Sequence, residues 1–367
     1  LRWEEAYSGK LLMPLELANA AWNGAILENP TYDTDYDQWH NTLIPCVRIP
    51  YILSRIATTL ATHTFSGEAL SEPEFQSLIL VNNYTLDQVI RAQYDDLLYY
   101  KRNAYKALIN LNKHVPQLTA ADFIARLCTT FSLYLDIADD QMVFQKKRAR
   151  IAAPANDIAN DISIEYTVAT NRVNGWKLSH LRNDKDTMPL AGQFTDITFE
   201  GGEAVTQIHQ SLVMGEHYLY GLTKMPATRQ PLLSNVFDTG AANSTLPFTL
   251  LFFWGNQPGG ASITYPYASS DNRNQPGKYL GRYTLDISGP DGLYEQHHKG
   301  IIEATVADVV TIVAYLTIGQ LQRLLTWSSA RLRFYHPEGA VTGILRTVQA
   351  TLREGWRIAT RLDVLRP

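Results

Sequence analysis

Two stretches decide how the chain is divided: residues 231–267, PLLSNVFDTGAANSTLPFTLLFFWGNQPGGASITYPY, and residues 271–283, DNRNQPGKYLGRY. Glycine, proline and asparagine recur here too often for a helix, because each of them interrupts a helical backbone. Large rings, which are scarce in disordered linkers, also gather here: Phe252, Phe253, Trp254, Tyr265 and Tyr267. We therefore expect residues 226–300 to form an ordered excursion, with one strand at 246–253.

On both sides of this excursion the apolar residues recur at steps of three and four, which is typical of helices that face a core. Pro50 can open a helix, since the first turn needs no N–H at that position. Period-two alternation predicts short strands at 162–168 and 195–199. The main helices are expected at 86–114, 119–150, 203–222, 301–327 and 338–365. The expected fold is mainly α, with 1–225 and 301–367 as a helical body and 226–300 as a smaller irregular and β insertion that protrudes from it.

The composition is that of a folded globular protein with a large core. The chain has 367 residues, of which 45% are apolar and 19% charged, and its net charge of -4 gives no global attraction to nucleic acid. Cys46 and Cys128 are too few for a disulfide framework, so buried free thiols are expected. The most apolar window, 309–319, is shorter than the roughly 20 residues that cross a bilayer. Because the chain starts at Leu1 with no signal-type stretch, we expect it to be the ordered part of a longer polypeptide.

An acidic cluster offers one route to an enzyme. Asp136, Asp139 and Asp140 could supply the carboxylate oxygens that Mg²⁺ prefers, which would make the chain a helical metal-dependent enzyme. The spacing argues against this, since Gln-Met-Val-Phe follows Asp140 where a further acid is needed. No nucleophile elbow, zinc motif or phosphate cradle is present, and His297-His298 is expected as a surface pair. We expect no catalytic residue, metal or cofactor.

Two basic segments are candidates for RNA contact. On the expected last helix, guanidiniums line one face at steps of seven, four and four: Arg346, Arg353, Arg357 and Arg361. A second basic run ends the helix at 119–150 with Lys146, Lys147, Arg148 and Arg150. Each phosphate that such a group neutralises adds salt-dependent affinity. The alternative for both segments is a solvated surface.

The rings of the excursion are candidates for a subunit interface. Tyr and Trp are enriched where surfaces become buried against partners. This gives Phe252, Phe253, Trp254, Tyr265 and Tyr267 a possible role in dimer contacts. The alternative is that they pack onto their own domain.

This layout resembles the capsid proteins of small double-stranded RNA viruses of plants and fungi, the partitivirus type. Those proteins have a mainly helical shell domain, a mid-chain arch that pairs subunits, and an N-terminal arm. By this resemblance, 86–114, 119–150 and 301–365 would form the shell, 226–300 the arch, and Leu1 would follow an arm.

The resemblance implies a self-assembling coat subunit that forms dimers and larger symmetric shells around RNA, found in the virion and the host cytoplasm. It implies no membrane and no small-molecule substrate. A metal-dependent enzyme, or a scaffold or toxin-complex piece of a longer chain, stays open as an alternative.

Overall fold

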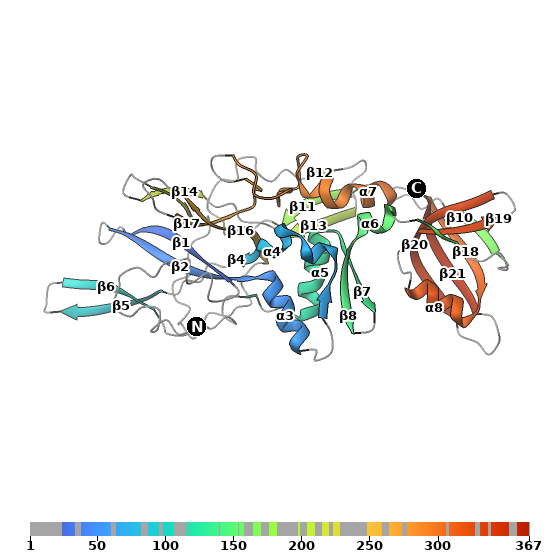
Figure 1. The fold of residues 1–367 in the computed structure, drawn as a ribbon, viewed down its shortest axis with the longest axis horizontal. Coiled ribbons are helices and arrows are strands. Elements are labelled where there is room, and N and C mark those ends of the chain that lie inside the picture. Colours follow the sequence, from blue (N-terminus) through green and yellow to red (C-terminus); the bar gives the residue numbers. More distant parts are fainter. Residues whose placement is uncertain are drawn as a thin grey trace.

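The computed structural model of the protein is an elongated molecule in which strands dominate (Figure 1). It describes residues 24–33, 38–59, 64–81, 87–94, 98–105, 115–116, 118–138, 140–152, 154–157, 164–169, 176–181, 197–198, 204–209, 215–219, 223–227, 248–258, 264–273, 277–305, 308–326, 331–336, 339–351 and 358–366. The expectation of a mainly α fold is wrong, because most of the expected long helices are strands.

A five-stranded antiparallel sheet organises the middle of the molecule. Its strand order is β1 (Gly24–Asp33), β2 (Gln38–Arg48), β4 (Leu78–Val81), β16 (Thr249–Pro258) and β17 (Thr264–Ser269). Strand β16 confirms the strand expected at 246–253. Its continuous apolar run is explained by burial on both faces. Leu250 and Phe252 enter the main core, whereas Leu251 and Phe253 enter a smaller core on the opposite face.

Short helices and a second sheet pack around the main core. The helices are α3 (Ile49–Thr59), the 3-10 turn η1 (Glu68–Ser71), α4 (Pro73–Ser77) and α5 (Ala120–Thr130). The sheet has the order β3 (Thr64–Ser66), β8 (Gln141–Lys146) and β7 (Leu133–Ala138), and α6 (Lys147–Ala152) follows β8. Pro50 lies in the first turn of α3, as expected. Thr119 caps α5, where its hydroxyl accepts the N–H of Asp122 at 3.0 Å.

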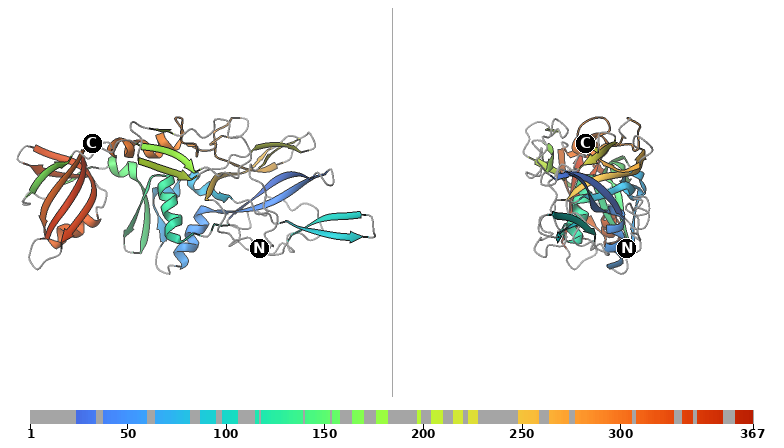
Figure 2. Two further views of the ribbon diagram at one scale, coloured as in Figure 1. Left: turned by 180° about the vertical axis from the view of Figure 1, so that it is seen from behind. Right: turned by 90° about the vertical axis from the view of Figure 1, so that its left-hand side faces the viewer.

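A six-stranded sheet with its own core occupies one end of the molecule (Figures 1 and 2). Its strand order is β10 (Ile164–Ala169), β18 (Asp308–Leu316), β21 (Ile358–Arg366), β20 (Gly339–Thr351), β19 (Arg331–His336) and β9 (Asn156–Asp157). Helix α8 (Ile318–Thr326) adds Leu321 and Leu324 to this core. Strand β10 confirms the period-two pattern at 162–168.

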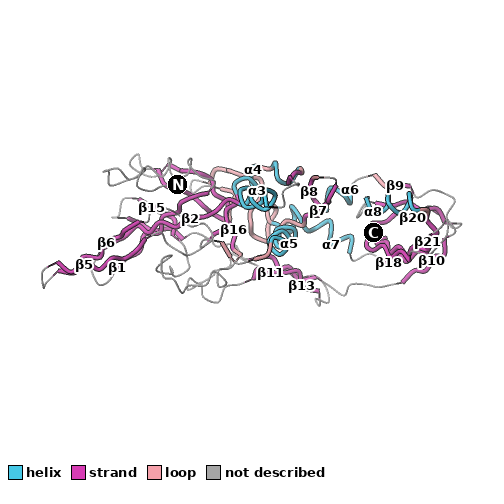
Figure 3. The backbone as a smooth tube through the Cα atoms, turned by 90° about the horizontal axis from the view of Figure 1, so that it is seen from below, coloured by secondary structure: helices cyan, strands magenta, loops and turns pink. Residues whose placement is uncertain are grey.

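The other sheets of the described residues have two or three strands each. They are β11 (Trp176–Leu181) with β12 (Ile197–Thr198) and β13 (Ala204–His209), the hairpin β14 (Gly215–Leu219) and β15 (Thr223–Ala227), and the hairpin β5 (Asp87–Tyr94) and β6 (Leu98–Tyr105). The π-helical turn η6 (Tyr294–His298) leads into α7 (Lys299–Thr305). Hairpins β1–β2 and β5–β6 lie at the end of the molecule opposite the six-stranded sheet (Figures 1 and 3). In the described part of the chain, no helix is long and apolar enough to span a bilayer.

The last expected helix, 338–365, is instead two strands, and a β-bulge explains the error. The pairing of β20 with β21 shifts between Leu345 and Thr347, which inserts one extra residue. As a result Leu345 and Val348 both contact the core although they are three residues apart. A helical spacing in the sequence is therefore produced by a bulged strand.

The other expected helices fail because the structure forms strands over much of their described residues. Residues 86–114 contain the hairpin β5–β6, 203–222 contain β13 and β14, and 301–327 contain β18 between α7 and α8. Among the described residues of 119–150, only α5 and α6 are helical. The β18 run, DVVTIVAYL, is rich in β-branched residues, and a short apolar run of this kind fits a strand as well as a helix.

Gly67 is required by its backbone conformation and its surroundings. Its φ is 123°, and a Cβ atom there would lie 2.2 Å from the carbonyl oxygen of Phe144. We expect Gly67→Ala to lower the free energy of unfolding, measured by urea denaturation, by about 1–3 kcal/mol. Gly319→Ala is the matched control, since that Cβ would enter open space in α8 and alanine favours a helix. Equal stability of the Gly67→Ala variant and the unmodified chain would contradict the described geometry.

Candidate functional site

The structure places the excursion's rings mainly inside their own chain. Phe252 is 0% exposed, Phe253 4% and Tyr267 8%, so these side chains present almost no surface to another subunit. Trp254 is half-buried and its indole N–H donates to the carbonyl oxygen of Asp271 at 3.0 Å. Tyr265 lies on β17, opposite Gln257 of β16. The packing of residues 248–258 and 277–298 onto the main core shows that much of the segment 226–300 belongs to the body of the molecule.

The expected row of arginines is not formed as a helix face. Arg346 lies at the bulge of β20 and Arg361 on β21, whereas Arg353 and Arg357 lie outside the described residues. Arg361 is exposed and its Nε contacts Asp363 at 3.4 Å.

The basic run is divided between two elements. Lys146 ends β8, and its ammonium pairs with Glu72 at 2.5 Å. Lys147, Arg148 and Arg150 lie in α6. Contact of these groups with RNA stays a prediction.

The structure describes only part of the acidic cluster. Asp136 lies on β7, Asp140 lies in the turn before β8, and Asp139 is outside the described residues. The carbonyl oxygen of Asp140 accepts the N–H of Thr64 at 3.0 Å. Among the residues that the structure describes, no three His, Cys, Asp or Glu side chains are grouped to hold a metal ion.

An ionic latch, formed by Glu72, Glu74, Lys146 and Arg282, joins the excursion to the N-terminal half; its two carboxylates are buried, whereas the Arg282 side chain is 63% exposed. Glu74 is 1% exposed, and its carboxylate accepts three bonds from Arg282: from the backbone N–H at 2.6 Å, Nε at 3.1 Å and Nη2 at 3.0 Å. Arg282 also reaches Glu72 at 2.9 Å. Burial alone would raise the pKa of Glu74, but the hydrogen bonds from Arg282 outweigh it and hold that pKa below its ordinary value.

Next to Arg282 in the sequence, Tyr283 packs with Phe131 and His297 in a cluster of three buried aromatic side chains. The Tyr283 ring lies 4.7 Å from His297 and 6.4 Å from Phe131, measured between centroids. The hydroxyl of Tyr283 and both ring nitrogens of His297 are buried with no hydrogen-bond partner among the described residues. The adjacent His298 places its Nε2 3.0 Å from the carbonyl oxygen of Thr130. The expectation of a surface histidine pair is wrong, since both side chains are buried.

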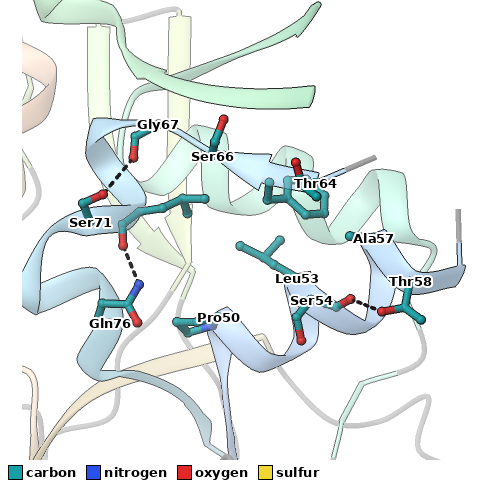
Figure 4. Close-up of a pocket in the computed structure, with 12 residues that line it drawn as sticks. Pro50, Leu53, Ser54, Ala57, Thr58, Thr64, Ser66, Gly67, Ser71 and Gln76 are labelled. Carbon is teal, nitrogen blue, oxygen red and sulfur yellow. Dashed lines mark hydrogen bonds between the residues drawn. The ribbon is translucent and has the colours of Figure 1, made fainter. Parts of the chain in front are cut away.

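An open cavity of about 860 Å³, within the size range of ligand pockets, lies between α3, β3 and the turn η1 (Figure 4). Figure 4 shows Ser54 and Thr58 of α3 on one side and Thr64 and Ser66 of β3 on the other. Leu53 is a buried lining residue. The described lining carries no charge and is rich in hydroxyl groups: Pro50, Leu53, Ser54, Ala57, Thr58, Thr64, Phe65, Ser66, Gly67, Leu70, Ser71 and Gln76.

Two hydroxyl groups of this cavity donate their protons to backbone carbonyl oxygens of α3 itself. Ser54 donates to the carbonyl oxygen of Tyr51 at 2.7 Å, and Thr58 to that of Ser54 at 2.8 Å. A hydroxyl that donates in this way keeps its lone pairs as acceptors. The cavity can therefore accept hydrogen bonds from an uncharged ligand that carries N–H or O–H groups.

The cavity also runs along an open sheet edge. Four consecutive residues, 64–67, line it, although successive strand residues face opposite sides of a sheet. A cavity touches all of them only when it lies beside the strand edge. Among the residues that the structure describes, strand β3 pairs with β8 alone, and Thr64 donates its N–H toward β8. The N–H and C=O groups of Phe65 therefore point away from β8, toward the open edge.

The amino-acid pattern carries little signal for either the latch or the cavity. The spacing of Ser71 and Glu74 is that of a helix-capping pattern, but the Glu74 carboxylate binds Arg282, which lies 208 residues away along the chain. The cavity is assembled from four separate elements whose hydroxyls look like ordinary surface residues. The chain matches no known protein family, and no curated protein shows significant sequence similarity to it.

Loss of the latch arginine should destabilise the protein. In an Arg282→Met variant the buried Glu74 loses two side-chain donors, and we expect a loss of about 1–3 kcal/mol in the free energy of unfolding, measured with urea. Arg273→Met is the control on the same segment, because its guanidinium contacts Asp291 at 3.9 Å and the exposed Tyr279, and surface contacts of these kinds contribute at most about 1 kcal/mol each. Equal losses in the two variants would contradict the latch.

The buried histidines should make stability fall in acid. Burial lowers the pKa of His297 to about 3 and that of His298 to about 4, and nearby positive charges add to both shifts. Since the pKa of an unfolded histidine is about 6.5, only the unfolded chain takes up these protons as the pH falls below that value. The stabilising contribution is complete above pH 6.5 and decreases toward the folded pKa values, by about 1.4 kcal/mol per pH unit for each histidine.

Urea midpoints at pH 7, 6 and 5 measure this effect. His297→Phe removes one of the two protons taken up on unfolding, so its stability should change less with pH than that of the unmodified chain. The same pH dependence in both proteins would contradict the assignment to His297.

Proposed function

We propose that this chain is a structural subunit that assembles with copies of itself by adding strands to open sheet edges. The observation that carries the proposal is the exposed edge of β3 beside the uncharged cavity. Each described sheet also has two outer strands without a further strand neighbour among the described residues. Unpaired edges are the surfaces through which β-sheets join one another.

The composition of β3 supports this role. Natural proteins protect an edge strand with lysine, proline or an inward charge, and also by keeping it short or covering it. The segment Thr64-Phe65-Ser66 is short, with 3 residues, but it carries no lysine, proline or other charge that would oppose pairing. The facing wall, Ser54, Ala57 and Thr58 of α3, is also uncharged. An added strand would hydrogen-bond to the Phe65 backbone on one side and meet hydroxyl acceptors on the other.

The coat-protein role expected from the sequence is one form of this proposal. The sequence suggested this role through an expected helical shell, which the observed strands contradict. The proposal therefore rests on the open sheet edges and not on helices. Exposed apolar side chains near the six-stranded sheet offer further contact surface: Tyr315 is 39% exposed, Tyr335 48% and Ile318 62%. A coat protein would also co-purify with RNA, whereas another structural assembly would not.

Native size measurements test the proposal. We expect light scattering after size exclusion to show species larger than one chain, and electron microscopy to show regular particles. Ala57→Glu places a charge where the added strand would lie, so it should shift the population to monomer while circular dichroism stays unchanged. The ratio of absorbance at 260 and 280 nm separates a coat protein from an assembly without nucleic acid.

Thr59→Glu is the matched control, since Thr59 is exposed on the same helix and is not among the residues described as lining either cavity beside it. It should assemble like the unmodified chain. A chain that stays monomeric at all concentrations would overturn the proposed function. Unchanged assembly of the Ala57→Glu variant would remove β3 as the contact.

A further inference from the structure

Helix α3 borders a second cavity on its other side. Leu53, Ser54, Ala57 and Thr58 face the cavity beside β3, whereas Tyr51, Ile52, Arg55 and Ile56 line a separate cavity of about 390 Å³. Residues four apart lie above one another on a helix, so these sets form two neighbouring stripes. The volume lies within the range of small-molecule sites.

The floor of this second cavity is apolar. Val47 of β2 is 2% exposed, Leu80 of β4 0% and Phe123 of α5 5%. Ile52, Ile56, Val115 and Leu118 are partly buried and pack against the main core. A ligand must therefore bring an apolar body to fill it.

Positive charge and N–H donors gather at the rim. Arg55 is exposed and is the only charged residue among the described residues that line the cavity. Ala120, the first residue of α5, also lines it. The first N–H groups of a helix have no carbonyl partner within it, and the helix end carries partial positive charge. The Thr119 hydroxyl accepts the N–H of Asp122, which leaves those of Ala120 and Ala121 to an outside acceptor.

We propose that this cavity binds an unbranched monocarboxylate with an apolar tail, such as a medium-chain fatty acid. The tail fills the floor between α3, α5 and the sheet, and the carboxylate meets Arg55 and the start of α5. A guanidinium matches the planar carboxylate with two parallel donors. The carboxylate of Asp122 in the first turn of α5 disfavours a doubly charged head group, such as a phosphate monoester.

Binding of ¹³C-carboxyl-labelled dodecanoate, followed by calorimetry and by the carboxyl NMR signal, tests the site. Over octanoate, decanoate and dodecanoate, affinity should rise about fourfold for each methylene that becomes buried. Arg55→Gln should weaken dodecanoate about tenfold and leave the neutral dodecan-1-ol unchanged. Ala120→Trp, which fills the rim from an exposed position, should weaken both.

Lys278→Gln is the control for loss of a positive charge elsewhere, and should bind dodecanoate like the unmodified chain. Thermal melting of each variant shows that it is folded. Absence of saturable binding, equal dodecanoate affinity in the Arg55→Gln variant, or unchanged binding in the Ala120→Trp variant would overturn the proposal. None of these outcomes depends on whether the chain assembles.

Discussion

The buried carboxylate of Glu74 is the constraint on which the arrangement of the body depends. It accepts hydrogen bonds from the backbone N–H and two side-chain donors of Arg282, a residue 208 positions away. Residues 277–292 form little regular structure, and ordering each residue costs about 1–2 kcal/mol. That cost is offset where Tyr283, Leu285 and Ile287 enter the main core directly after the latch. The ion pair fixes the position, and burial of these side chains supplies most of the stabilisation.

Local signals could be predicted from the sequence, whereas partners could not. Pro50 and Thr119 act at helix starts through their own backbone neighbours, and the alternation at 162–168 indicates a strand directly, which β10 forms over 164–169. The failures have a common cause. Apolar spacing reports that a residue faces a core, but a bulged strand such as β20 satisfies a helical spacing equally well. The sequence around Glu74 does not indicate that Arg282 is its partner, because the fold alone brings these two residues together.

The candidate sites depend even more on tertiary arrangement. The cavity beside β3 needs α3, β3, η1 and α4 at once, and Gly67 allows the chain to pass against the backbone of Phe144. The sequence pattern favours an interface role for the rings of the excursion, because aromatic side chains are enriched where surfaces become buried against partners. Phe252 and Phe253 instead fill two cores from opposite faces of one strand. An aromatic sequence reports that area is buried, and only the fold identifies the surface that buries it.

The position of α3 connects the two cavities. A helix of 11 residues is marginal alone in water, so packing on its two sides decides where it lies. A ligand that fills the cavity lined by Ile52, Arg55 and Ile56 binds the same helix turn that carries Ser54, Ala57 and Thr58. Since the latter residues form the wall opposite β3, holding α3 in place also fixes the width available to an added strand. Both proposed sites therefore act on one element, and any coupling between them must pass through the packing of α3.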